Sequence, residues 1–238
     1  MKGFKKYIIW LDEVGRWPLA GPVTVGGVFV NPLSLKSPLP HPKSTSFRAL
    51  FTKEGTNWMG MITDSKKLNA KKREYLTTQL LSCPDIIWAT SFVSAKYIDR
   101  HGIVAAIRKA SLDVIDQIIK KVTSLLWDGR VQDLEILLDG KTDYGLRKVF
   151  WEIPAYARMT FQTIIKWDSL VREIGAASII AKVQRDEYMT KLAHKKKYQV
   201  YEFDRHKGYG TLLHRNAIGQ YGLSDIHRKS FCSKIMLF

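Results

Sequence analysis

The chain has 238 residues, of which 45% are hydrophobic and 25% are charged, and this composition excludes collagen-like, low-complexity and disordered proteins. The length accommodates one large α/β domain, with or without a smaller appendage. Lysine and arginine number 38 against 22 aspartates and glutamates, and the resulting net charge of +16 favours a polyanionic partner such as nucleic acid.

Strands and then a helix are predicted from the first third of the chain. An apolar run over residues 7–11 predicts a buried strand, and a β-branched run over 23–30 predicts a second strand after a turn rich in Gly and Pro. Residues 31–57 contain four prolines and scattered Ser and Thr, which predicts a surface loop. Asn69 is the expected N-cap of a helix over 70–81, whose apolar residues recur with helical period.

The middle of the chain continues this alternation. Residues 86–93 predict a third strand. A helical stretch begins at Ser94 and is broken near Gly102, after which an apolar stripe extends to Ile119. Residues 134–138 predict a compact apolar strand that an Asp-Gly pair follows directly.

The last third contains a strand and two helices. Residues 163–166 predict another strand, and the helix over 174–191 has a face of small residues suited to close packing on a sheet. A second, short helix is expected over 212–221, with Gly222 as its cap. The order of these elements predicts an α/β fold with a mixed β-sheet flanked by helices.

Cellular location is predicted from what the sequence lacks. Cys83 and Cys232 are the only cysteines, so the chain carries neither a disulfide framework nor a Cys-x-x-Cys metal site. The apolar run after the basic first residues is too short for an export signal, and no run approaches the length of a membrane helix. We expect a cytoplasmic protein that binds nucleic acid and no membrane. A basic surface that serves only solubility is the alternative.

Carboxylates follow the predicted strands at the points where the strands end. Because binding sites in α/β sheets form outside the carboxyl ends of strands, these acids can converge although they are far apart in sequence. Two adjacent acids can face one site only if their strand ends there, and Gly15 and Pro18 predict such an end. The alternative is that each acid is a solvated strand terminator or a helix cap. The acids are Asp12, Glu13, Asp139 and Asp168.

Four clustered carboxylates repel one another and raise each other's pKa unless a cation neutralises them. Oxygen ligands without patterned Cys or His favour Mg²⁺ or Mn²⁺, and two such ions roughly 3.5–4 Å apart can hold both reacting oxygens of a phosphodiester. With the basic charge, this pattern predicts a nuclease. Four histidines lack zinc spacing and are interpreted as structural groups or backbone contacts: His194, His206, His214 and His227.

Several ordered sequence blocks that span nearly the whole chain closely resemble the ribonuclease HII family. The resemblance implies a ribonuclease H-like fold with a small helical carboxyl-terminal part. It implies a catalytic domain over residues 1–193 and a basic segment over 194–238 that completes the substrate groove. The blocks are residues 10–23, 64–68, 138–140, 175–183 with Arg185-Asp186, 206–211 and 227–231.

The resemblance also implies roles for individual residues. The metal-binding acids fall on Asp12, Glu13, Asp139 and Asp168, which would hold two Mn²⁺ or Mg²⁺ ions. Substrate contacts fall on a turn that senses the ribose 2′-hydroxyl, on a tyrosine that stacks at the RNA–DNA junction, and on phosphate-binding side chains. These residues are Gly15, Arg16 and Trp17 for the turn, Tyr209 for stacking, and Ser65, Lys66 and Lys182 for phosphates.

The implied activity is hydrolysis of RNA in RNA/DNA hybrids and cleavage on the 5′ side of single ribonucleotides in duplex DNA, leaving a 3′-hydroxyl and a 5′-phosphate. The expected partners are these nucleic acids, and the protein is expected to be a monomer. A ribonuclease HIII is disfavoured because it resembles the chain less at Gly15 and Arg16. A related nuclease that acts on DNA without ribonucleotides is a further alternative.

Three positions depart from the family pattern, because Trp10, Trp17 and Trp167 stand where the family has glycine. A glycine in such a motif indicates a positive φ or a close approach of the backbone to the ligand, and an indole provides neither. If the tryptophans are real, the alternative function is a catalytically impaired hybrid-binding protein. We hypothesise instead that they are UGA codons meant as glycine, as in some bacterial codes; UGG codons at these positions would contradict this.

The connection from Asp139 to Asp168 spans 29 positions and looks longer than in the family. Residues 153–160 within it are interpreted as extra loop.

Overall fold

A five-stranded sheet forms the centre of the protein within the residues that this computed structural model describes, which are 7–31, 57–126, 134–152, 159–164 and 171–233. The strand order is β3-β2-β1-β4-β5, in which β1, β2 and β3 are antiparallel neighbours and β4 and β5 run parallel to β1. The strands are β1 (Tyr7–Val14), β2 (Val23–Val30), β3 (Ile86–Val93), β4 (Leu134–Asp139) and β5 (Thr160–Ile164).

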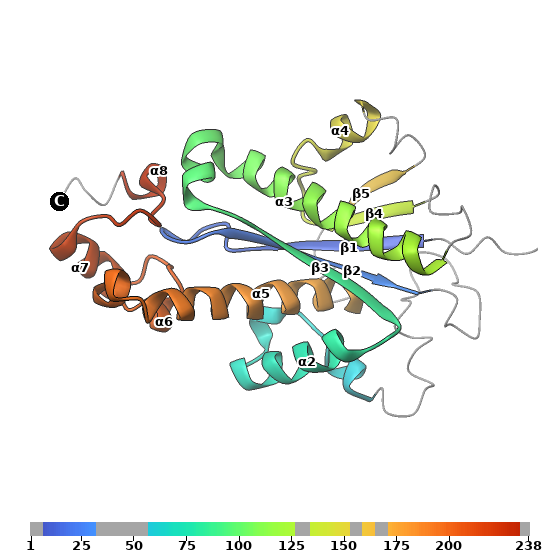
Figure 1. Ribbon diagram of the computed structural model, residues 1–238, viewed down its shortest axis with the longest axis horizontal. Helices are drawn as coiled ribbons and strands as arrows, with labels where there is room; N and C mark the ends of the chain where they lie inside the picture. The colour runs from blue at the N-terminus through green and yellow to red at the C-terminus, as the bar shows by residue number, and fades with distance from the viewer. Residues whose placement is uncertain (1–6, 32–56, 127–133, 153–158, 165–170, 234–238) are drawn as a thin grey trace, which may run out of the picture.

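Helices cover both faces of this sheet, with α3 on one face and α5 and α2 on the other (Figure 1). Successive residues of a strand alternate between faces, so Ile9 and Leu11 pack with α3 while Ile8 and Trp10 pack with α5. The helices are α2 (Ala70–Ser82), α3 (Ala95–Leu126), α4 (Leu146–Glu152), α5 (Arg172–Ala193), α6 (Phe203–His206), α7 (Leu212–Tyr221) and α8 (Lys229–Cys232), with 3₁₀ turns η2 (Asn57–Met61), η3 (Ser65–Lys67) and η6 (Lys196–Tyr201).

The predicted α/β fold is confirmed, and several expected boundaries coincide with the observed ones. Strands β2 and β3 and helix α7 have the predicted bounds. Asn69 caps α2 by accepting a hydrogen bond from the amide of Lys72 at 2.9 Å. Gly102 breaks α3 with a φ of 81°, and the amide of Gly222 closes α7 by donating to the carbonyl of Ile218.

Other boundaries were wrong. Strand β1 continues past Leu11 to Val14, because Glu13 and Val14 still pair with β2. Residues 146–152 form the short helix α4 in the long connection after β4. Strand β5 lies three residues earlier than predicted at its start. Most of the predicted loop over 31–57 and residues 165–170 lie outside the described residues. So do residues 153–158 of the extra loop predicted over 153–160, whereas Thr160, the last residue of that prediction, is in β5.

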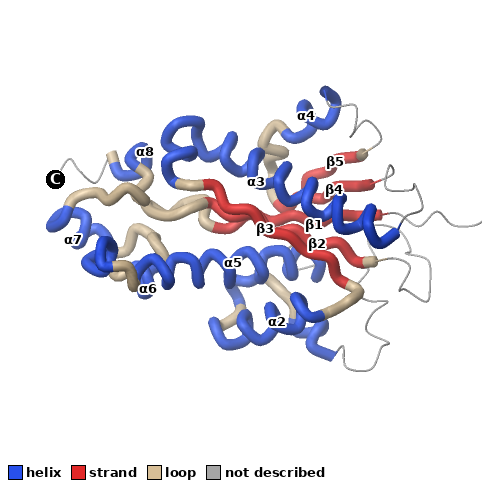
Figure 2. The backbone as a smooth tube through the Cα atoms, viewed as in Figure 1, coloured by secondary structure: helices blue, strands red, loops and turns tan. Residues whose placement is uncertain are grey.

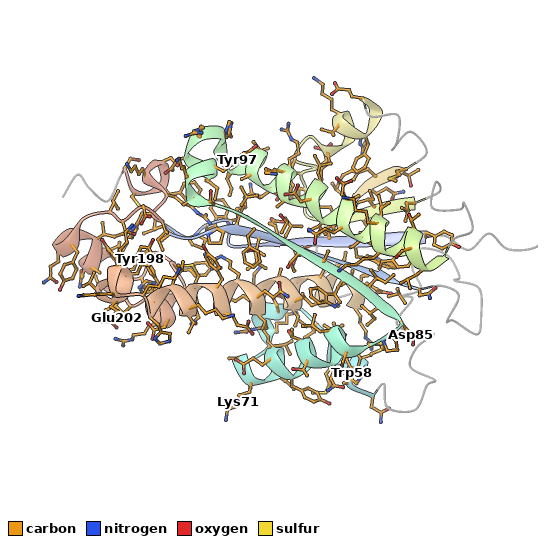
Figure 3. The ribbon with its side chains drawn as sticks, in the orientation of Figure 1. Trp58, Lys71, Asp85, Tyr97, Tyr198 and Glu202 are labelled. Carbon is orange, nitrogen blue, oxygen red and sulfur yellow. The ribbon has the colours of Figure 1, made fainter. Side chains whose placement is uncertain are left out.

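The carboxyl-terminal elements pack against the loop that follows β1, at one end of the sheet (Figure 2). Ala20 forms a β-bridge with His227, and the amide of Gly21 donates to the carbonyl of Ile226 at 2.8 Å. Figure 3 shows Tyr198 and Glu202 of this part at the end opposite Trp58 and Asp85. Among the described residues, no helix combines the length and the apolar character that a membrane span requires.

Candidate active site

Two of the predicted acids, Asp12 and Asp139, lie side by side near the carboxyl ends of β1 and β4. The parallel register pairs Leu11 with Leu138, and this places the next residues, Asp12 and Asp139, next to each other. The charge of Asp139 contributes to the raised pKa of Asp12, as expected for neighbouring carboxylates. The structure therefore brings together two acids that are separated by most of the chain.

Glu13 does not follow the expected geometry. Strand β1 ends at Val14, directly before the predicted stop at Gly15, but Glu13 is still within the strand and therefore lies on the face opposite Asp12. Its Oε1 accepts a hydrogen bond of 2.8 Å from the hydroxyl of Tyr144, in the loop between β4 and α4. Glu13 remains close enough to Asp12 that its charge raises the pKa of Asp12.

The electrostatics of these acids disfavour their charged forms. Burial, followed by the charge of Glu13, raises the pKa of Asp12 well above its usual value. Burial also raises the pKa of Glu13, although the Tyr144 hydrogen bond and the charge of Arg16 oppose the shift. Buried carboxylates with raised pKa values are typical of functional sites.

The acids fit a divalent cation in their chemistry. Glu13 Oε2 is buried and has no hydrogen-bond partner among the described residues, and hard cations prefer such carboxylate oxygens. No three His, Cys, Asp or Glu side chains are close enough to hold an ion together within the described part of the chain. Asp168, the fourth predicted ligand, lies outside that part.

Ser65 supports Asp12 through a second serine. The Ser65 hydroxyl is 2.9 Å from the hydroxyl of Ser178 on α5, and Ser178 hydrogen-bonds Asp12, which lowers the pKa of Asp12. Ser65 is buried, so its hydroxyl is committed to this network, whereas the neighbouring Lys66 is exposed. Sequence reasoning missed Ser178 because its small side chain was interpreted as packing surface.

The turn after β1 is held by a buried arginine from the carboxyl-terminal part. Arg228 is fully buried, and its guanidinium donates to the carbonyls of Gly15 at 2.7 Å, Arg16 at 3.0 Å and Gly21 at 2.9 Å. Gly15 has a φ of +84°, and a Cβ there would lie 2.2 Å from Nε of Arg185. This position therefore requires glycine.

The tryptophans at two glycine positions have backbones that any residue can adopt. Neither Trp10 nor Trp17 has a positive φ. Trp10 is buried between β1 and α5, whereas Trp17 is 73% exposed and its ring lies 5.1 Å from the guanidinium carbon of Arg16. The indole of Trp17 thus covers the residue expected to sense the ribose. Trp167 lies outside the described residues.

Tyr209 lies beside Lys182, so two predicted substrate contacts are neighbours. The Lys182 Nζ is 5.5 Å from the centre of the Tyr209 ring, and Tyr209 is partly exposed. Lys182 also pairs with Asp186 at 2.8 Å, one helical turn along α5. Arg185, the neighbour of Asp186 in the same motif, points elsewhere and donates to the carbonyls of Pro22, Ala20 and Lys207.

Three of the predicted structural histidines form a buried cluster that holds Tyr209. A carbonyl only accepts, so His214 Nδ1 donates to the carbonyl of Tyr209 at 2.9 Å. His214 Nε2 must then accept from His227 Nε2 at 3.0 Å, and His227 Nδ1 accepts from the amide of Ser224 at 2.9 Å. His206 Nε2 donates to the carbonyl of Tyr201 and its Nδ1 accepts from the amide of Gly208. Their predicted structural role is confirmed.

This cluster predicts a loss of stability in acid. Burial lowers the pKa of both His214 and His227 to about 4, below the usual 6.5. The unfolded chain therefore binds more protons between these values, and we expect the free energy of unfolding to fall on the order of 3 kcal/mol per histidine as the pH drops from 6.5 to 4. Urea unfolding at several pH values measures this free energy.

His214→Gln should reduce the dependence of the free energy of unfolding on pH, whereas the exposed control His194→Gln should not. An equal pH dependence in both variants would contradict the argument.

The fold and the site together define a class of protein. A mixed sheet of this kind between helices, with carboxylates near the ends of two neighbouring strands, is the ribonuclease H-like fold. The solved ribonuclease H2 from Pyrococcus horikoshii superposes on this protein with a TM-score of 0.61 at 23% identity. The superposition covers 96% of this chain and 96% of that chain and shows that the two share a fold.

Sequence comparison then gives the family. The ribonuclease HII profile matches residues 51–234. Ribonuclease HII of Rickettsia bellii is 34% identical over 231 residues, which cover 95% of this chain and 92% of that protein. Ribonuclease HII of Chlamydia muridarum is 37% identical over 224 residues, which cover 94% of this chain and 81% of that protein. The chain belongs to the ribonuclease HII family and is a metal-dependent endoribonuclease that acts on nucleic acid.

Proposed function

We propose that this enzyme hydrolyses RNA in RNA/DNA hybrids and also cuts on the 5′ side of single ribonucleotides embedded in duplex DNA. The products are a 3′-hydroxyl and a 5′-phosphate. The observation that carries the proposal is the adjacency of Asp12 and Asp139 near the carboxyl ends of β1 and β4, close to the turn that contains Arg16. With only two cysteines the chain carries no disulfide framework, which favours the reducing cytoplasm, and we expect the enzyme to act there as a monomer.

The acids would bind the metal ions, and the surrounding side chains would position the acids. Asp12, Glu13, Asp139 and Asp168 would hold two Mg²⁺ or Mn²⁺ ions, which when bound supply an activated water and stabilise the leaving oxygen. Ser178 and Ser65 keep the Asp12 carboxylate in place. The raised pKa of Asp12 in the free protein is the electrostatic cost that a bound cation removes.

Recognition of the ribose would come from the turn after β1. Arg16 has a buried Nε without a hydrogen-bond partner among the described residues, and a guanidinium donor of this kind suits a 2′-hydroxyl, the group that distinguishes RNA from DNA. Tyr209 would stack on the neighbouring deoxyribose, and Lys182 and Lys66 would contact phosphates. The carboxyl-terminal segment over 194–238 would complete the groove, since it carries both Tyr209 and the Arg228 anchor.

A second candidate function follows from Trp17. Its exposed indole covers Arg16, and a protein with this obstruction would bind a hybrid without cutting it. The variant Trp17→Gly separates the two functions, because it removes the indole from a position whose backbone is not strained.

The test is cleavage of a labelled DNA duplex that contains one ribonucleotide, with Mg²⁺ or Mn²⁺. We expect cleavage on the 5′ side of the ribonucleotide and none in an otherwise identical all-DNA duplex. The Trp17→Gly variant is expected to cut about tenfold faster, because uncovering the guanidinium restores one charge-assisted hydrogen bond. Cutting of the all-DNA duplex would refute the substrate assignment. Binding without cutting by both proteins would favour the binding function.

A further inference from the structure

The hydroxyl of Tyr144 lies between two residues that the proposed function gives separate tasks. It donates to Glu13 Oε1 at 2.8 Å and accepts from Nη1 of Arg16 at 3.0 Å. The direct separation of Arg16 Nη1 and Glu13 Oε1 is longer, at 4.0 Å. The two charged groups are therefore too far apart for a direct hydrogen bond, and this one hydroxyl bridges them through two hydrogen bonds.

Tyr144 is held rigidly enough to fix that geometry. Its backbone has a φ of 50°, in the left-handed region, and its side chain is buried against the α3 face of the sheet. Nε of Arg108, on α3, donates to the Tyr144 carbonyl at 2.7 Å. The side chain of Asp143 accepts from the amide of Gly145 at 3.0 Å, which closes the same turn. A rare backbone conformation that its neighbours over-determine is typical of a functional position.

The two hydrogen bonds act in the same direction. Arg16 donates to the hydroxyl and the hydroxyl donates to Glu13, so each bond polarises the other and strengthens it. Each partner keeps one unsatisfied buried atom, Oε2 in Glu13 and Nε in Arg16. Tyr144 thus restrains Oε1 of Glu13 and Nη1 of Arg16. It leaves Oε2 of Glu13 for a cation and Nε of Arg16 for a hydroxyl.

We propose that Tyr144 is a specificity-determining positioning residue that holds the ribose-sensing Arg16 in register with the metal-binding Glu13. The enzyme then recognises a 2′-hydroxyl at a fixed position relative to the divalent-ion site. This inference rests on the proposed function, since it assumes that Arg16 reads the ribose. Tyr144 touches neither substrate nor ion and acts through its two neighbours.

The test measures binding rather than turnover. All proteins carry Asp139→Asn so that the duplex stays intact, and dissociation constants are measured in Mg²⁺ for a duplex with one ribonucleotide and for the matched all-DNA duplex. Tyr144→Phe keeps the buried ring and removes the hydroxyl. We expect it to reduce the preference for the ribonucleotide about tenfold, the effect of losing a hydrogen bond to a charged group.

Tyr198→Phe is the matched control, because the Tyr198 hydroxyl also donates to a carboxylate, that of Asp225, at 2.9 Å. It should leave the preference unchanged. In an Arg16→Met background, Tyr144→Phe should have no further effect, since the coupled partner is already absent.

Two outcomes would overturn the inference. One is an undiminished preference in a Tyr144→Phe protein that melts at the same temperature as the Tyr198→Phe control. The other is an additive loss in the Arg16→Met background, which would make Tyr144 a structural residue. If the parent protein shows no preference for the ribonucleotide, the proposed function itself fails, and the two failures are therefore distinguishable.

Discussion

Replacing Asp12 with asparagine is expected to stop cleavage and, in the metal-free protein, to raise the melting temperature. Asparagine keeps the shape of the side chain but removes the charge that would hold a cation and stabilise the transition state. Because such stabilisation amounts to several kcal/mol, the cleavage rate should fall roughly 10³-fold. Gel-based cleavage of a ribonucleotide-containing duplex measures the loss.

Asp12→Asn is expected to stabilise the metal-free protein although it stops cleavage, because the Asp12 carboxylate is buried. Burial and the charge of Glu13 raise the folded-state pKa of Asp12 above its usual value of 3.8. The stability that protonated Asp12 provides is therefore fully present below pH 3.8 and is lost as the pH rises through the raised value. Above it, the wild type carries an unfavourable buried charge that Asp12→Asn lacks.

Melting curves between pH 4 and 8 test this sign. The difference in melting temperature between Asp12→Asn and the wild type should grow with pH. Added Mg²⁺ should raise the melting temperature of the wild type more than that of the variant. The exposed residue Asp204 provides the control, since Asp204→Asn makes the same change of charge without burial. A variant that melts below the wild type at neutral pH without metal would contradict the argument.

Arg228→Met is expected to lower the free energy of unfolding by about 4 kcal/mol. The change leaves three carbonyls, those of Gly15, Arg16 and Gly21, without their charged donor in a buried site. Burial, with the nearby charge of Arg185, lowers the pKa of Arg228 to about 9, so the guanidinium is still charged at neutral pH. Urea denaturation measures the loss.

Two further variants sharpen this prediction. Arg215→Met changes an exposed arginine on α7 and should shift the free energy of unfolding by less than about 0.5 kcal/mol. Arg228→Lys should rescue little, because one ammonium cannot span the three carbonyls that the planar guanidinium reaches. Full stability in Arg228→Lys would show that charge alone, and not the forked geometry, holds the turn.

Sequence patterns predicted the architecture well where local chemistry determines it. Asn69, Gly102 and Gly222 mark helix boundaries through caps and through a φ that favours glycine, and the structure confirms all three. The acids Asp12 and Asp139 could be expected to meet because both follow apolar strands. The family resemblance also led to the correct fold.

The rest depended on contacts between distant segments, which spacing does not encode. Tyr144 is a lone tyrosine in a long connection, and only its hydrogen bond to Glu13, 131 positions away, gives it a role. Arg228 is likewise one basic residue among many until its burial is known. The end of β1 was wrong because pairing with β2 continues beyond the apolar run.

The anchoring of the first turn by Arg228 has a consequence for the way the protein is made. A ribosome synthesises the residues of the turn early, but the side chain that holds their carbonyls leaves the exit tunnel more than two hundred residues later. Until then these three carbonyls lack their charged donor, so the turn after β1 is fully held only after the carboxyl-terminal part has been synthesised.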